Sequence, residues 1–201
     1  MKRLLNTCLI VCLAVVPLFN TGCAYYVGKD HPTVSYSELR PAAAEKTPLL
    51  LNFKYLANGV YDKDLTKSHR VKFMLMLRDS GLFSSVTFAD DQVSNSGPRM
   101  DLVLNETFDK GSTFMKGLIT GLTFFIIGSN ATSDYRFEGS YTRPGMEPVS
   151  FNYNHKLYMT VGLIVSKPDG ILKYNCDAAV DHIAMDLTIH FLRDLQQAGQ
   201  L

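Results

Sequence analysis

Two segments in the second half of the chain alternate strictly between apolar and polar side chains, which limits them to strands with one buried face. Residues 134–142 place Tyr135, Phe137 and Tyr141 on one side and Arg136, Glu138 and Ser140 on the other. Residues 149–157 repeat the pattern, and the intervening residues 143–148 contain the Pro and Gly of a hairpin turn. The two segments therefore predict an antiparallel hairpin whose apolar face covers a core.

Two helices are predicted beside these strands. Asp62 or Asp64 can cap a helix that runs to about Arg78, and Gly81 just beyond it provides a stop. Residues 175–197 form the second helix, because apolar side chains recur there along one stripe. Both helices are therefore amphipathic and need an apolar surface to pack on.

Further strands are expected over residues 49–56, 82–88 and 101–108, where alternating or β-like patterns occur between turn signals. The order of elements is strand, helix, four strands, helix. This order predicts an α+β fold. We expect a two-layer sandwich, with a mostly antiparallel sheet of about five strands and two helices on one face.

The composition excludes two classes of protein. The chain of 201 residues is 46% hydrophobic, and its 20 Lys and Arg nearly balance 19 Asp and Glu. A chain this apolar is not disordered, and a chain this balanced in charge is not a nucleic-acid binder. The length suits one domain with a real core.

The first residues have the order of a secretory signal: Lys2 and Arg3, then an apolar run from Leu4 to Phe19, then small residues up to Cys23. The Thr21-Gly22-Cys23 junction resembles the lipobox of bacterial lipoproteins. The resemblance implies cleavage before Cys23 and lipid attachment to that cysteine, and Ala24 after it implies transfer to the outer membrane.

This resemblance divides the chain into three parts. Residues 1–22 are expected to be a cleaved signal peptide, 23–47 a lipidated N-terminus and tether, and 48–201 a single α+β domain. Loss of Lys2 and Arg3 with the signal leaves 18 basic side chains against 19 acidic ones. The element order over about 48–197 also resembles small lipoproteins of envelope assembly, such as the lipopolysaccharide-assembly lipoprotein.

The most apolar part of the mature chain is Phe114–Ile127. As a helix it would be about 21 Å long, too short to span a membrane. If 101–108 pairs with 134–142, this segment lies at one end of the sheet, and residues 158–165 return to the same end. Both segments are expected either in the core or on a contact surface for the membrane or a partner. The candidate contact residues are Leu118, Ile119, Leu122, Phe125, Ile126 and Leu163.

The last helix carries His182, Asp186, His190 and Asp194 at four-residue steps, so all four share one face. Such a face can hold a metal or a proton relay if another element adds a ligand, and His155 is the candidate. The preferred interpretation is a solvated polar face with pairs four residues apart, and no metal site.

No motif for catalysis or cofactor binding occurs, such as a P-loop, G-x-S-x-G, H-E-x-x-H or C-x-x-C. Cys176 near the start of the last helix is expected to be a small buried residue, the alternative being a thiol of lowered pKa. We therefore expect no cofactor and no enzymatic activity.

The expected function is that of an outer-membrane lipoprotein facing the periplasm, an accessory or interaction subunit of the cell envelope. Its expected partners are the membrane, through the lipid anchor, and an envelope protein. Two alternatives remain open: a lipid-binding module, and a metal-dependent enzyme that uses the face formed by His182, Asp186 and His190.

Overall fold

The structure is a computed structural model of the full chain. It describes residues 24–32, 34–40, 46–91, 97–108, 129–162, 166–173 and 175–201.

The strands form one sheet of eight. They are β1 (Ala24–Val27), β2 (Pro48–Ala57), β3 (Val60–Tyr61), β4 (Ser85–Phe88), β5 (Arg99–Phe108), β6 (Ser129–Thr142), β7 (Val149–Val161) and β8 (Ile171–Lys173). Their spatial order is β3-β2-β5-β6-β7-β1-β8, with β4 paired to β2 outside this path.

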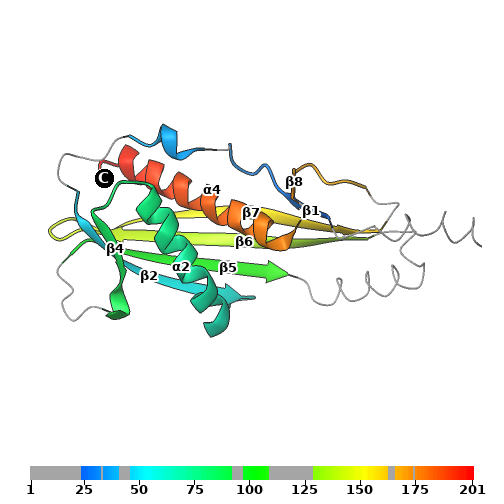
Figure 1. Cartoon of the computed structure of the whole chain (residues 1–201), viewed down its shortest axis with the longest axis horizontal. Helices are drawn as coiled ribbons and strands as arrows, with labels where there is room; N and C mark the ends of the chain where they lie inside the picture. The colour runs from blue at the N-terminus through cyan, green and yellow to red at the C-terminus, as the bar shows by residue number, and fades with distance from the viewer. Residues whose placement is uncertain are drawn as a thin grey trace, which may run out of the picture.

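Two long helices, α2 (Lys63–Asp79) and α4 (Cys176–Gln197), lie together on one face of this sheet (Figure 1). Two short 3-10 turns, η2 (Tyr36–Glu38) and η3 (Ala89–Asp91), complete the described elements. We call the face under the helices the core face. The predicted α+β class with two helices on one face is confirmed.

The predicted number of strands and their direction were partly wrong. The sheet has eight strands, and β2 pairs in parallel with both β4 and β5. The chain returns from β2 through α2, a crossover that places the following strands parallel to β2. The other pairs are antiparallel, including the predicted hairpin of β6 and β7.

The ends of the helices follow the local sequence signals. The Asp62 carboxylate accepts hydrogen bonds from the backbone N–H of Asp64 and Leu65, so Asp62 is the N-cap of α2. Gly81 follows the helix with a φ of 70°, a left-handed conformation that glycine adopts without strain. Asn175 caps α4 by accepting from the N–H of Ala178 at 2.7 Å.

The core lies between the core face and the helices. Phe53 of β2 stacks on Phe73 of α2 with ring centroids 4.5 Å apart, and Phe137 of β6 meets Phe191 of α4 edge-on at 5.9 Å. Gly139 lets α4 come close, because a Cβ at this position would lie 2.8 Å from the Phe191 ring. The alternating apolar residues therefore fill the core as predicted.

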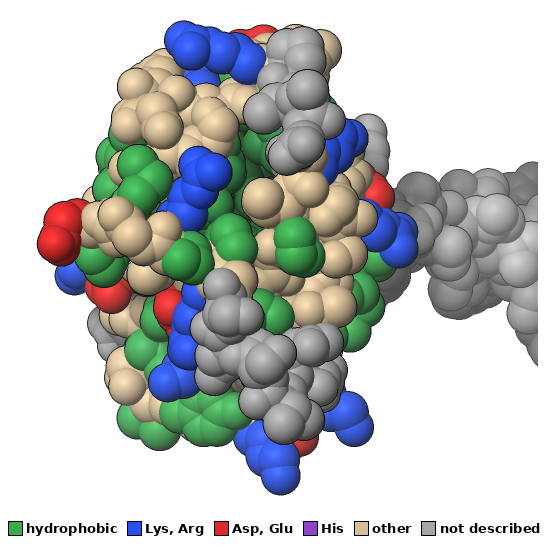
Figure 2. Space-filling view, turned by 90° about the vertical axis from the view of Figure 1, so that its left-hand side faces the viewer, with side chains coloured by type: hydrophobic (Ala, Val, Ile, Leu, Met, Phe, Trp, Pro, Cys, Tyr) green, Lys and Arg blue, Asp and Glu red, His purple; other side chains and the backbone are tan. Residues whose placement is uncertain are grey.

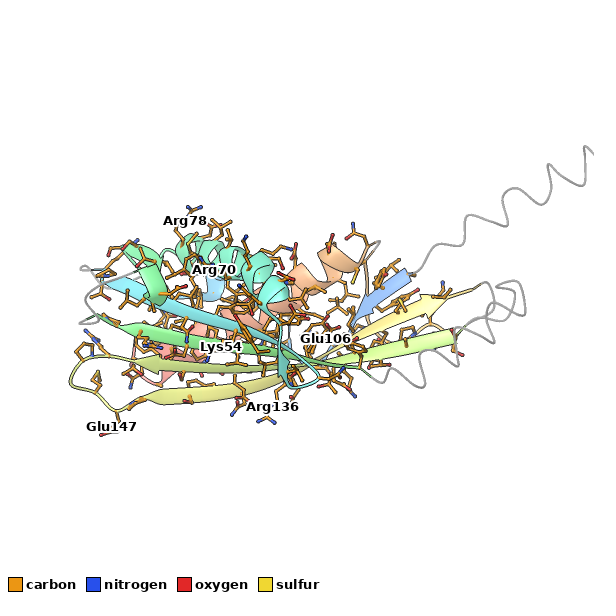
Figure 3. The ribbon with its side chains drawn as sticks, turned by 90° about the horizontal axis from the view of Figure 1, so that it is seen from below. Lys54, Arg70, Arg78, Glu106, Arg136 and Glu147 are labelled. Carbon is orange, nitrogen blue, oxygen red and sulfur yellow. The ribbon has the colours of Figure 1, made fainter. Side chains whose placement is uncertain are left out.

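The opposite face of the sheet is polar. Arg136 pairs with Glu138 at 2.9 Å, and Arg99 pairs with Asp101 at 2.8 Å. Figure 3 shows Arg136 pointing away from the helix layer, whereas Arg70 and Arg78 lie on the helix side. This face is solvent-exposed, as in a two-layer fold.

The structure differs from the expected tether over 23–47. Ala24–Val27 form β1, which pairs with β7 on one side and β8 on the other. Val27, Val34 and Leu39 are buried. Backbone hydrogen bonds to two neighbouring strands and burial of apolar side chains hold this segment on the domain, so its described residues do not stand off from it.

Candidate functional site

The two ends of the sheet differ. At one end the β6–β7 hairpin turns at residues 143–148, and at the other β1 begins, β5 ends and β6 begins. We call the second end the open end, because β6 and β7 continue there beyond α4 (Figure 1). The predicted antiparallel pairing of 101–108 with 134–142 is confirmed, and the hairpin turn lies at the opposite end of the sheet from the last residue of β5.

A cavity of about 350 Å³ occupies the core face at the open end. Its apolar lining comes from four strands and comprises Tyr25, Phe108, Ala131, Leu157 and Met159. Its polar lining is Glu106, Thr132, Ser133 and Cys176. A cavity of this size and chemistry is typical of a site for an apolar ligand or an apolar side chain of a partner.

The Glu106 carboxylate is fully engaged at the edge of this cavity. It accepts hydrogen bonds from the hydroxyls of Tyr55 at 2.6 Å and Tyr135 at 2.9 Å. Burial, together with the Glu106 charge, raises the pKa of both tyrosines, which therefore remain protonated donors. Figure 3 shows Glu106 between the sheet and the helix layer. This arrangement holds a carboxylate in place without offering a free base.

Cys176, the first residue of α4, is exposed, so the prediction of a buried residue was wrong. The start of the helix lies over the cavity and not within the core. Partial burial and the charges of Glu106 and Asp177 raise the pKa of this thiol. The thiolate is the nucleophilic form, so Cys176 is a poor nucleophile at neutral pH.

A second site lies where α4 crosses β7. His155 of β7 and Asp186 of α4 are almost fully buried, with side-chain exposures of 0% and 4%. His155 Nε2 lies 3.6 Å from Asp186 Oδ2, and His182 Nε2 lies 3.7 Å from the same oxygen. The Asp186 carboxylate therefore contacts two imidazoles from two different elements.

The loop after β1 completes this site. Asp30 Oδ2 lies 3.4 Å from His155 Nδ1, and the His31 ring centroid lies 6.0 Å from that of His155 and 5.1 Å from that of His190. We call His31, His155, His182 and His190, with Asp30 and Asp186, the histidine cluster. It contains four of the five histidines of the chain.

Several polar atoms in the histidine cluster are buried without a hydrogen-bond partner: His155 Nε2, His182 Nε2, His190 Nε2 and Asp186 Oδ1. Burial lowers the pKa of His182, and Lys173 and His155 lower it further, while the Asp186 charge opposes them. Of the four imidazoles, His182 is therefore held toward its neutral form, because burial disfavours the charged ring.

The prediction of a solvated face on the last helix was therefore wrong at Asp186 and His190, which are buried. That side of α4 packs on β7 and not against water. His155 is the predicted additional residue, and the structure brings it to Asp186. Within the described ranges, however, no three His, Cys, Asp or Glu side chains are grouped so that they could hold a metal ion.

Asp30 and His31 were missed because they lie in the expected tether. Neither belongs to an apolar period or a spaced pair, so no sequence signal connected them with residues more than a hundred positions away. Only the pairing of β1 with β7 brings them to the cluster.

A groove of about 490 Å³ separates α2 from α4. Lys72 of α2 and Asp181 of α4 form an ion pair across it at 2.5 Å. His182 lines the groove as well as belonging to the histidine cluster. The groove therefore gives solvent access toward one side of the cluster.

The other predicted site residues lie outside the described residues: Cys23, Leu118, Ile119, Leu122, Phe125, Ile126 and Leu163. Their roles remain predictions. The first part of the 158–165 segment belongs to the sheet, because β7 continues to Val161. Among the described residues, none of the helices has the length and apolar character needed to cross a bilayer.

Comparisons with known proteins give only distant likenesses. No protein-family model and no curated protein matches the sequence. A rare lipoprotein B structure from Shewanella oneidensis is 14% identical, with a TM-score of 0.39, over 76% of this chain and 96% of that one.

Two further solved structures are similar at the same level. A putative neuraminyllactose-binding hemagglutinin homolog from Helicobacter pylori is 12% identical with a TM-score of 0.43, over 82% of this chain and 89% of that one. The PelC dodecamer structure from Paraburkholderia phytofirmans is 10% identical with a TM-score of 0.32, over 84% and 98%. Because all three TM-scores are below 0.5, we base no functional conclusion on them.

Proposed function

We propose that this protein is a lipid-anchored, non-enzymatic accessory protein of the bacterial outer membrane, whose open end faces the membrane and an envelope partner. The observation that carries this proposal is the position of β1. Its first residue, Ala24, pairs with Thr160 near the open end and directly follows Cys23. A lipid on Cys23 would therefore hold the open end, and not a distant tether, at the bilayer surface.

The chemistry of the open end supports the same orientation. Tyr25 lies two residues after Cys23 and lines the apolar cavity together with Phe108 and Met159. The opposite end, which faces the viewer in Figure 2, has hydrophobic side chains interspersed with Lys, Arg and other polar groups. Apolar contact sites are typical of interaction surfaces, and among the described residues the apolar cavity lies at the end of the sheet where the proposed anchor would be.

The anchor is tested by replacing Cys23 with Ser in the producing bacterium. We expect the variant to lose incorporated palmitate and to leave the membrane fraction, because several acyl chains on one residue make attachment durable. Cys176→Ser is the matched control and should remain in the membrane. A Cys23→Ser variant that stays membrane-bound would refute the lipid anchor.

The orientation is tested with a photo-crosslinking amino acid in intact cells. Met159 at the open end and Met146 in the β6–β7 turn are matched positions, since both are methionines at opposite ends of the same hairpin. We expect crosslinks to one envelope protein or to lipid from position 159 only. Equal products from both positions, or products from position 146 alone, would contradict the proposed orientation.

A second candidate function is a lipid-binding module, and the cavity favours it. Its volume of about 350 Å³ lies within the range of small-molecule sites, and its lining is largely apolar. Native mass spectrometry of the Cys23→Ser chain separates the two functions. A lipid retained without the anchor supports the module, and an empty chain that still crosslinks to a protein supports the accessory role.

A further inference from the structure

The loop that follows β1 is fastened onto β7 by three hydrogen bonds. Gly28 N–H donates to the Lys156 carbonyl at 2.8 Å, and Lys156 N–H donates to Asp30 Oδ2 at 2.9 Å. His31 Nε2–H donates to the Asn154 carbonyl at 2.9 Å. We call residues 28–32 the strap. Two of its titratable side chains, Asp30 and His31, enter the histidine cluster.

The four imidazoles of the cluster differ in whether a carboxylate lies beside the ring. His155 and His182 face the Asp186 carboxylate, and His155 also faces Asp30. His31 and His190 instead face each other, with ring centroids 5.1 Å apart. In the part of the chain that the structure describes, no ion pair joins either of these two rings to a carboxylate.

The hydrogen bonds of His190 show which ring nitrogen would take a second proton. Its Nδ1–H donates to the Asp186 backbone carbonyl at 2.8 Å, because a carbonyl can only accept. Nε2 then carries the lone pair, and it is buried without a partner. A second proton would therefore sit on Nε2, in a buried position beside the His31 ring.

The surrounding charges do not compensate such a proton. On α4, Asp194 accepts from the Tyr153 hydroxyl at 2.7 Å and contacts Arg193 at 3.3 Å. On the strap, Lys29 pairs with Asp169 at 2.6 Å. Beside His182, Asp181 pairs with Lys72, and Lys173 of β8 adds a positive charge. The two carboxylates of the cluster, Asp30 and Asp186, contact His155 and His182, so two protons on His31 and His190 would have no such partner among the described residues.

We propose that the histidine cluster is an acid-sensitive clasp, which holds the strap on β7 and α4 while His31 and His190 are neutral and releases it when both are protonated. The two protons come from solvent and no covalent bond changes. Repulsion between two imidazolium rings at this separation acts directly on the strap, because His31 is part of it. Removal of His31 would also free the Asn154 carbonyl.

Hydrogen exchange of the full chain in detergent, measured by mass spectrometry at about pH 7.5 and about pH 5, tests this proposal. After correction for the intrinsic rate, we expect peptides covering 24–32 to lose protection about tenfold or more at the lower pH. Peptides from β5 and β6 should keep theirs. His190→Phe, which fills the site without titrating, should keep the strap protected at both pH values.

The matched control is His69→Phe, since His69 lies on α2, outside the cluster, with Nδ1 bonded to the Leu65 carbonyl. It should respond to pH as the parent chain does. If His190→Phe is already unprotected at about pH 7.5, His31→Phe takes its place. A parent chain that keeps its strap protected at about pH 5 would overturn the proposal. Equal acid release in the substituted and parent chains would also overturn it.

Discussion

The two halves of the core face have the same alternating pattern but different surroundings. In the covered half, Met100 and Leu102 of β5 lie beneath the helices with exposures of 0% and 1%. At the open end, Phe108 of the same strand and Met159 of β7 are only partly buried and line a cavity. The same alternation therefore leads to fully buried core in one half and to partly buried side chains around a cavity in the other.

The cause is a difference in length between the two layers. β6 has 14 residues and a strand of that length spans about 46 Å, whereas α4 has 22 residues and spans about 33 Å. β6 and β7 therefore continue past the start of α4, as Figure 1 shows. Alternation tells which side chains face the helix layer, but not whether a helix is present above them.

A pair of methionine truncations is the strongest test of this comparison. Met100→Ala should lower the free energy of unfolding by about 3 kcal/mol, because it removes buried contacts and leaves a void. Met159→Ala should cost less than about 1 kcal/mol, since it only enlarges an existing cavity. Urea unfolding measures both. Equal losses would mean that something covers the open end as fully as the helices cover the other half.

The boundary between the halves is tested at Glu106. Glu106→Leu leaves the hydroxyls of Tyr55 and Tyr135 without an acceptor and should cost about 2 kcal/mol. Adding Tyr55→Phe and Tyr135→Phe should recover part of that loss, because no buried donor then remains. If the triple variant is less stable than Glu106→Leu alone, the hydroxyls have other acceptors and the carboxylate is not what holds them.

The smallest expected effect is a pH dependence that arises in the covered half. The folded protein lowers the pKa of His182 below its usual value near 6.5, so folding favours the neutral ring. This contribution to stability is complete above about pH 6.5 and is lost as the pH falls. Asp186→Asn removes a charge that supports the protonated ring, so it should steepen the loss. Unfolding curves between about pH 7.5 and about pH 5 measure both slopes.

If the free energy of unfolding of Asp186→Asn depends on pH as in the parent chain, or less steeply, the assignment of this pH dependence to His182 is contradicted. Glu106→Gln is the control from the open end, because its partners are tyrosines that stay protonated throughout this range. It should change the overall stability and leave the slope as it is. The two substitutions thus distinguish Glu106, which accepts from hydroxyls that stay protonated, from Asp186, whose charge acts on the pKa of His182.

Much of the helical layer could be predicted, because its signals are local. The side chain of Asp62 bonds backbone groups two and three residues away, and Gly81 terminates the helix by its own φ angle. The face shared by His182, Asp186 and His190 follows from helical spacing alone. Whether that face meets water or β7 does not follow from spacing, and here the prediction was wrong.

The sheet was predictable only within single strands. The hairpin of β6 and β7 needs one short turn, so its register is a local property. The parallel pairing of β2 with β5 and β4 depends on where the chain returns after α2. β1 has four residues and no alternation, so its sequence alone does not predict a strand. It is a strand because it pairs with β7 on one side and with β8 on the other.

By itself, the sequence determined the α+β class, a cap at Asp62 or Asp64, the stop at Gly81, the alternating strands and the signal-like pattern that ends at Cys23. Each of these depends on neighbouring residues or on the period of a regular backbone. The tertiary structure alone decided that β1 joins the sheet beside the proposed anchor. It also decided that Asp30 and His31 join the histidine cluster, and that β6 and β7 extend beyond the start of α4. These are long-range contacts, and they depend on how whole layers pack.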